Sequence, residues 1–218
     1  MLRFVKGKFW LPLAFILVFA LSRIPGMLPQ NFSAAYALMF CAGVYFVGRI
    51  AWWLPLTVVL LTDVALNFYW QAKGNPVWDP AILRYQLINY VAYGVLIWLG
   101  RRFKPKSSFF SLLGGGMLGA LLFYLVTNTA SWLFNPFHNP EYTRDLAGWL
   151  IALTKGTGGW PQTWEFFRNT LLSGGLFTGL FVGAMKLTAA SESPQEKEAG
   201  AKVGAPSETE EEPEEAKA

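Results

Sequence analysis

Polar side chains recur at helical spacing along the edges of the last two long apolar segments. The residues of each group are three, four, seven or more positions apart, so each group occupies one face of a helix. The groups are Tyr124, Asn128, Ser131 and Asn135, and Glu165, Arg168, Asn169 and Ser173. Polar groups within a membrane usually turn toward the bundle interior or a watery cavity. We therefore expect the two faces to lie opposite each other and to form a cup that binds a solute.

Two earlier apolar segments carry similar polar faces. One contains Asp63 and Asn67, and the other contains Gln86, Asn89 and Tyr93. With the N-terminus inside the cell, all four faces fall in the outer half of the membrane, where aromatic residues and a few amides would line an outward-open site. The predicted substrate-binding residues are Asp63, Asn67, Asn89, Tyr93, Tyr124, Asn128, Trp132, Glu165, Arg168 and Asn169.

The same side chains have a simpler explanation as hydrogen bonds between helices, worth about 1 kcal/mol each. Asp63, the only carboxylate inside an apolar run, either pairs with Arg84 or Arg168 or serves as counter-charge to a cationic group or a coupling ion. Glu165 and Arg168, one turn apart, fit a local ion pair. The only histidine, His138, lies in a Pro/Asn loop without evident co-ligands. We predict no catalytic residue, no metal site and no cofactor.

Composition predicts an all-α integral membrane protein. Of 218 residues, 53% are hydrophobic and 15% are charged, and apolar runs repeat along most of the chain. The first run could also be read as a signal peptide, but no small-x-small cleavage site follows it, which favours a short membrane helix. We predict a six-transmembrane-helix bundle with helices at Phe9–Leu21, Phe32–Val47, Trp52–Trp70, Arg84–Leu99, Phe109–Phe134 and Trp164–Leu187.

The charge divides the chain into two parts. Residues 1–187 hold fifteen Lys and Arg against five Asp and Glu, a net +10, whereas residues 188–218 hold nine Glu against three Lys, a net −6. The basic excess flanks apolar runs, so it indicates membrane topology and no nucleic-acid partner. The acidic C-terminal segment lacks aromatic residues. We predict a transmembrane domain over 1–187 and a disordered cytoplasmic tail over 188–218.

Basic residues also indicate the orientation. The short segment Arg101–Lys106 holds four of them, which places it, and with it both termini, on the cytoplasmic side of the inner membrane. The long loop between the last two membrane helices contains Leu146, Trp149, Leu150 and Leu153 at helical spacing, after Thr143 as a helix cap and Asp145 in the first turn. This pattern predicts a short amphipathic helix on the outer face.

Small residues four positions apart predict close approach of helix backbones. They form two runs, Gly175, Gly179 and Gly183 in the last helix and Gly115 and Gly119 in the preceding one. Packing within the bundle is the first interpretation, and docking to another subunit is the alternative.

Three stretches resemble an uncharacterised family of small bacterial membrane proteins: WLPLTVVLLTDVALNFYW at 53–70, FYLVTNTASWL at 123–133 and FFRNTLLSGGLFTGLFVG at 166–183. That family is similar to the substrate-binding S components of energy-coupling-factor vitamin transporters. The resemblance implies a six-helix bundle that binds a small vitamin-like solute from outside, with energy from a separate transmembrane coupling protein and ATPase subunits. The first helix departs from the docking pattern of S components, since it offers only Ala14 and Ala20 as small residues.

Three classes of function remain in view. A solute-binding transport component is favoured, and a structural or assembly membrane protein is the main alternative because of the glycine runs and the acidic tail. An intramembrane enzyme would rest on Asp63 and Glu165 as acid and base. The chain has no phosphate-binding loop and neither an HExxH nor a GxSxG motif. We therefore predict no enzymatic activity, with lipid, a small solute and the coupling subunits as partners.

The predicted orientation can be tested by cysteine labelling of intact cells. A cysteine placed at Asn139, in the outer loop, should react with a membrane-impermeant maleimide, whereas one placed at Ser107, beside the basic cluster, should not. The reverse pattern of labelling would refute the orientation and place the polar faces toward the cytoplasm.

Overall fold

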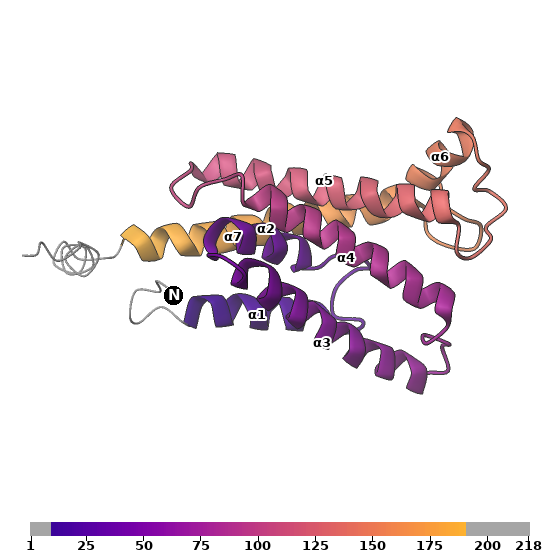
Figure 1. Cartoon of the computed structure of the whole chain (residues 1–218), viewed down its shortest axis with the longest axis horizontal. Helices are drawn as coiled ribbons and strands as arrows, with labels where there is room; N and C mark the ends of the chain where they lie inside the picture. Colours follow the sequence, from indigo (N-terminus) through magenta and orange to yellow (C-terminus); the bar gives the residue numbers. More distant parts are fainter. Residues whose placement is uncertain (1–9, 191–218) are drawn as a thin grey trace, which may run out of the picture.

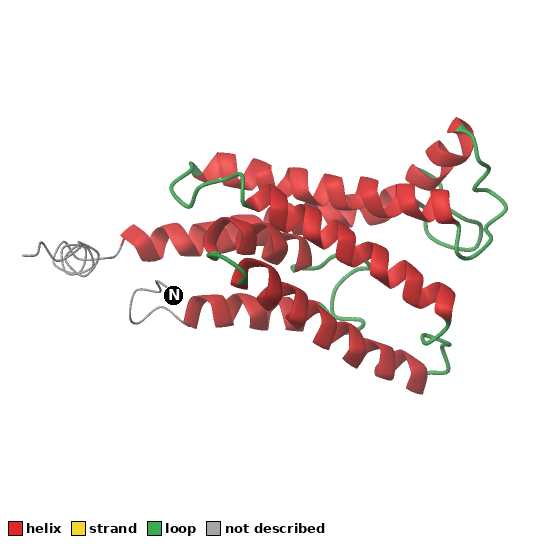
Figure 2. Cartoon of the chain, viewed as in Figure 1, coloured by secondary structure: helices red, strands yellow, loops and turns green. Residues whose placement is uncertain are grey.

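The computed structural model describes residues 10–190 of the 218-residue chain, and this part consists of helices joined by loops, without a strand (Figure 1; Figure 2). The helices are α1 (Trp10–Ser22), α2 (Ala35–Tyr45), α3 (Ile50–Ala72), α4 (Pro80–Gly100), α5 (Phe109–Phe134), α6 (Leu146–Leu153) and α7 (Thr163–Ala190). The all-helical prediction is confirmed, including the short helix in the last long loop. Arg3, Lys6, Lys8 and nearly all of the predicted tail lie outside the described residues, and α7 extends three residues beyond the predicted boundary at 187.

Four helices, α3, α4, α5 and α7, are long and apolar enough to cross a membrane. These helices indicate a membrane protein. Helices α1 and α2 are apolar but have only 13 and 11 residues, fewer than the roughly 20 that span a hydrocarbon core. In Figure 1 the ends of α1 and α2 that their linker joins lie well short of the end that α3, α4 and α5 reach.

Helix α2 lies at the centre of the bundle. Every residue from Ala35 to Val44 is buried, and the helix contacts α1, α3, α4, α5 and α7. Its close approach to α4 depends on two glycines. A Cβ atom at Gly43 would lie 2.2 Å from the Ile97 carbonyl oxygen, and one at Gly100 would lie 2.1 Å from that of Phe40. The two backbones therefore touch where any side chain would separate them.

Helices α5 and α7 also pack closely, but not through most of the predicted glycines. A Cβ at Gly116 would lie 2.2 Å from Thr178 Oγ1, and one at Gly174 would lie 2.7 Å from Ala120 Cβ. Among the glycines of the predicted runs, only Gly115 is as tightly enclosed, since a Cβ there would lie 2.6 Å from the Phe40 ring. The nearest atoms to a Cβ at Gly119, Gly175, Gly179 or Gly183 lie at 3.4 to 4.0 Å, ordinary contact distances. The face of α7 that meets α5 is thus displaced by about one residue from the predicted one.

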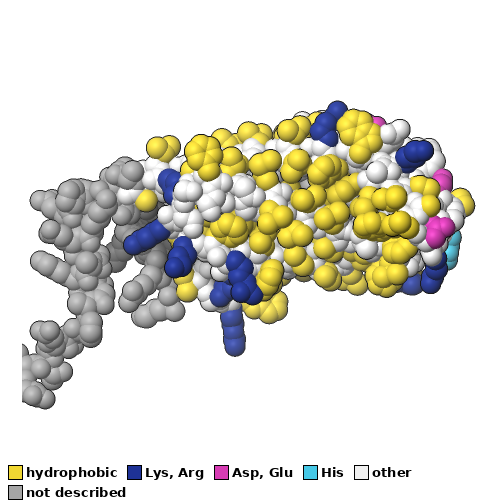
Figure 3. Space-filling view, turned by 90° about the horizontal axis from the view of Figure 1, so that it is seen from above, with side chains coloured by type: hydrophobic (Ala, Val, Ile, Leu, Met, Phe, Trp, Pro, Cys, Tyr) yellow, Lys and Arg dark blue, Asp and Glu magenta, His cyan; other side chains and the backbone are white. Residues whose placement is uncertain are grey.

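Charged side chains gather at the two ends of the molecule, and hydrophobic ones cover its length between them (Figure 3). The turn between α4 and α5, with Arg101, Arg102, Lys104 and Lys106, lies at the same end as the start of α1 and the end of α7 (Figure 1). The opposite end carries α6 and the acidic residues Asp79, Glu141 and Asp145. This distribution leaves an apolar band around the bundle, as a bilayer requires.

The cap of α6 is Asp145, not Thr143 as the sequence suggested. The Asp145 carboxylate accepts a hydrogen bond from the Gly148 amide at 2.8 Å, and the Thr143 hydroxyl supports it at 2.7 Å. The hydrogen bond from the Gly148 amide is the main reason that the pKa of Asp145 lies below its usual range, and the Thr143 hydroxyl adds to the effect. The helix buries Gly148 and Ala152 and leaves Leu146 and Leu150 67% and 48% exposed. Its apolar side chains are therefore free to enter a membrane interface.

The contact between α2 and α4 generates a stability prediction. Gly43→Ala should destabilise the protein by about 1–3 kcal/mol, because the added methyl group overlaps the Ile97 carbonyl. Gly94→Ala is the matched control within α4, since its Cβ would meet only Trp52, at 3.8 Å. Melting temperatures in detergent compare the two variants, and equal values would show that the α2–α4 contact does not limit stability.

Candidate functional site

An ion pair lies between the end of α1 and the middle of α3. The Arg23 guanidinium donates from Nη2 to Asp63 Oδ1, and the Tyr90 hydroxyl donates to Asp63 Oδ2 at 2.7 Å. The two charged side chains are only 18% and 16% exposed. Asp63 therefore has both oxygens occupied, one by a cation and one by a phenol from α4.

The predicted partner of Asp63 was wrong. The sequence suggested Arg84 or Arg168, but both are exposed, and Arg23 holds the carboxylate instead. The reason is the length of α1, which ends at Ser22 and brings the next residue to the depth of Asp63. The ion pair expected between Glu165 and Arg168 does not form: Glu165 accepts the Gln162 amide at 3.4 Å.

Aromatic side chains enclose the ion pair. The Arg23 guanidinium lies 5.7 Å from the centre of the Phe19 ring, which permits a cation–π contact. Tyr93 interacts with Arg23 and stacks on Phe123 with ring centres 5.1 Å apart. Arg23 Nε is buried and has no hydrogen-bond partner among the described residues. The Nε–H group of Arg23 is therefore a buried donor without a partner among the described residues of this aromatic surround.

The polar faces of α3 and α4 meet one turn beyond the ion pair. Asn67 and Gln86 exchange two amide hydrogen bonds, of 3.2 and 2.9 Å, so each side chain is both donor and acceptor. Asn89 is half-buried on α4, one residue before Tyr90. The predicted grouping of Asp63 and Asn67 with the α4 residues thus agrees with the structure.

The polar face of α5 holds the outer loop. The Tyr124 hydroxyl donates to the Leu153 carbonyl of α6, and the Trp132 indole donates to the Thr143 carbonyl at 2.7 Å. Asn135 ends the helix in the left-handed region, with φ 38°, and bonds the backbone of Asn139. Asn128 bonds the Tyr124 carbonyl of its own helix at 2.8 Å. Most of this face therefore positions α6 and the loop before it.

The polar face of α7 contacts the linker between α1 and α2. Asn169 donates to the Gln30 carbonyl at 2.9 Å, and the buried Ser173 bonds the Thr170 carbonyl of its own helix. Arg168 points outward, its guanidinium 5.5 Å from the centre of the Trp164 ring. The ring of Tyr124 on the α5 face lies 4.6 Å from the ring of Phe167, but Phe167 is on the side of α7 opposite its polar face. Asn128 and Asn169 have separate partners, so no hydrogen bond between described residues joins the two polar faces that the sequence placed opposite each other.

Sequence reasoning missed Arg23 and the linker carbonyl of Gln30. Arg23 is not among the predicted site residues, although it follows an apolar run of about 13 residues. A helix of that length rises about 20 Å, less than a bilayer core, so its last residue lies within the membrane depth. The shortness of this apolar run could therefore have indicated that Arg23 lies inside the bundle. No side-chain pattern indicates a backbone carbonyl such as that of Gln30.

The ion pair predicts a specific pattern of stability. Arg23→Met or Asp63→Leu alone should destabilise the protein by up to about 3–5 kcal/mol, because each leaves one charge unpaired in an apolar surround. The double variant should recover most of that loss. Arg84→Met, at an exposed position, is the control and should change the melting temperature little. Additive effects of the two single changes would mean that the charges do not interact.

Comparison with known proteins identifies a sequence family for this chain. No curated protein and no solved structure matches this chain. Residues 5–196, which include all seven helices, match the model of a family of unknown function, DUF6580. Because this match covers most of the 218 residues, the chain belongs to the DUF6580 family.

Proposed function

We propose that this protein is the membrane-embedded, solute-binding component of a transporter. The observation that carries the proposal is the Arg23–Asp63 pair, bonded by Tyr90 within a bundle of apolar helices. Charges are expensive at this depth, and those retained there usually mark a solute or ion path. A purely structural bundle often keeps nearly the same stability when a buried ion pair is replaced by apolar side chains of similar volume.

The geometry around the pair suits a binding site at the end of the bundle that carries α6. Helices α1 and α2 stop short of that end, which α3, α4 and α5 reach (Figure 1). Polar side chains on α3, α4, α5 and α7 lie in the half of each helix that is nearer that end: Asp63, Asn67, Gln86, Asn89, Asn128 and Asn169. In the orientation proposed from the basic residues, all six helices embed in the inner membrane and this end faces outward.

The hydrogen bonds at the site describe how a solute would enter. Asn67 and Gln86 satisfy each other, and Asn169 holds the linker at Gln30. A solute that binds here exchanges these internal bonds for its own, so it must offer both donors and acceptors. The site has no net charge, because Arg23 and Asp63 compensate. A small polar molecule with both donors and acceptors, such as the vitamin-like solute that the resemblance implies, fits this description.

The energy source would lie outside this chain. The sequence has no phosphate-binding loop, and the resemblance to S components implies a coupling protein with ATPase subunits. The alternative is a structural or assembly protein, for which the ion pair would only fix the position of α1 against α3. The two functions can be distinguished by purification, because only a solute-binding component should co-purify with a small molecule.

The test is native mass spectrometry of the protein extracted in mild detergent. We expect a small molecule bound to the wild type and its loss in Asp63→Asn and Asn169→Leu, with melting temperatures that show folded protein. Asn75→Leu, at an exposed turn outside the site, is the control and should keep the solute. A wild type without any solute that still purifies with a membrane partner would contradict the transport function and favour assembly.

A further inference from the structure

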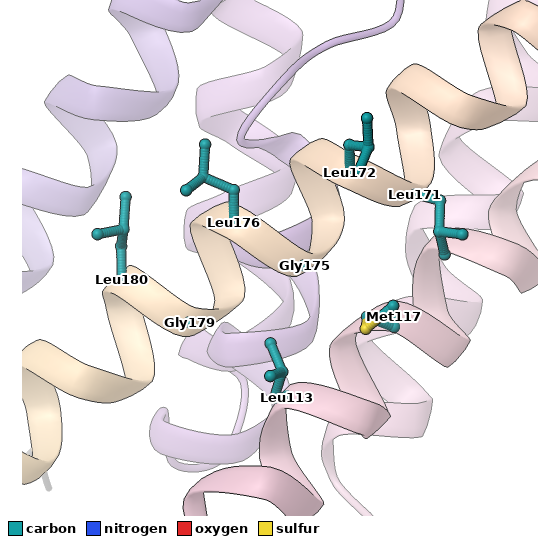
Figure 4. Close-up of a pocket in the computed structure, with 8 residues that line it drawn as sticks. All are labelled: Leu113, Met117, Leu171, Leu172, Gly175, Leu176, Gly179 and Leu180. Atoms are coloured by element: carbon teal, nitrogen blue, oxygen red, sulfur yellow. The ribbon is translucent and has the colours of Figure 1, made fainter.

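An apolar groove runs along the outside of the bundle between α5 and α7. Its volume is about 470 Å³, and Leu113 and Met117 of α5 form one side (Figure 4). Leu172, Leu176 and Leu180 project from α7 on the other side, and Gly175 and Gly179 lie between the two walls. The groove differs chemically from the surroundings of the Arg23–Asp63 pair, because every side chain that lines the groove is apolar.

The glycines keep the groove open. A Cβ at Gly175 would lie 3.5 Å from Met117, and one at Gly179 would lie 3.8 Å from Leu113, so neither glycine is needed for α5 and α7 to approach. That approach occurs on the neighbouring face, at Gly116 and Gly174. Side chains at 175 and 179 would instead occupy the groove itself. The exposure of Leu172, Leu176 and Leu180, each about half, shows that this surface faces the surroundings of the bundle.

A cation lies in line with the groove. Arg168 precedes Gly175 by 7 residues and Gly179 by 11, and at 3.6 residues per turn the three positions share one face within about 20°. Arg168 is exposed, and no carboxylate of the described residues pairs with it. Its guanidinium lies 5.5 Å from the centre of the Trp164 ring. Tryptophan and arginine together are typical of the headgroup level of a membrane.

The length of the groove matches one leaflet of a bilayer. From Leu171 to Leu180 the helix rises about 14 Å, and half of a hydrocarbon core is about 15 Å thick. An acyl chain that lies in the groove would therefore place its headgroup near the first turn of α7. Arg168 is the cation of α7 at that level, whereas the Glu165 carboxylate accepts the Gln162 backbone amide. A guanidinium binds phosphate through paired hydrogen bonds.

We propose that the groove is a binding site for an anionic phospholipid. One acyl chain lies between α5 and α7, and the phosphate contacts Arg168. The charge favours this occupant over a second copy of the chain, because two copies packed side by side in one membrane through this face would bring their Arg168 side chains together. The inference does not depend on the proposed transport function, since the groove and the Arg23–Asp63 pair are built from different residues.

The probe is phosphatidylglycerol, with phosphatidylcholine of the same acyl chains for comparison, added to the full-length protein in neutral detergent. Native mass spectrometry should show at least a several-fold preference of the wild type for phosphatidylglycerol, and the lipid should raise the melting temperature. Arg168→Gln should remove the preference, whereas Arg144→Gln, an exposed cation of the outer loop, should keep it. Inorganic phosphate should not compete.

The groove itself is tested with a matched pair of leucines. Gly179→Leu fills the groove and should lower the occupancy of both lipids, whereas Gly114→Leu adds the same side chain to an open surface of α5 and should not. The lipid-free melting temperature of each variant identifies any that fail to fold, and Leu180→Ala then provides a milder change of the groove. Equal binding of the two lipids, equal behaviour of the two arginine variants, competition by phosphate, or a dimer that Gly179→Leu disrupts would overturn the proposal.

Discussion

Two opposite charges within an apolar bundle must meet, and the pairing of Arg23 with Asp63 organises much of this structure. The pair requires α1 to end beside the middle of α3, which it does at Ser22. The second oxygen of Asp63 then receives the Tyr90 hydroxyl, so α4 is drawn to the same point. An unpaired charge here would cost several kcal/mol, comparable with the whole stability of many domains.

The ion pair fixes where the linker between α1 and α2 begins, because Arg23 is the first residue after α1. The linker begins inside the bundle, so its backbone needs partners there, and the surrounding helices provide them. Asn169 of α7 donates to the Gln30 carbonyl, Tyr36 donates to the Asn31 carbonyl, and Ser22 accepts the Ala34 amide. Hydrogen bonds to side chains of the helices therefore hold the linker, together with the packing of Leu28 and Phe32 on the core.

The bundle thus has two chemically distinct surfaces. The inner one, around Arg23 and Asp63, is polar and aromatic and is shielded by helices. The outer one, between α5 and α7, is apolar and ends at Arg168, which faces outward beside Trp164. The short helix α6 completes the outer end, with Leu146 and Leu150 exposed toward the interface. A membrane would contact the second surface and not the first, so the proposed solute and the proposed lipid would bind different residues.

The sequence by itself determined the local structure, because helix formation and apolar periodicity depend on neighbouring residues. It located the six apolar helices and α6, and it grouped Asp63 and Asn67 with the polar face of α4. What it left open was how far each helix enters the bundle and how it is rotated. Arg23 reaches Asp63 because α1 is short, and Gly174, not Gly175, meets α5 because packing rotates α7 by about one residue. Depth and rotation are set by the sum of all interhelical contacts, with α2 buried at the centre, so only the tertiary structure decided them.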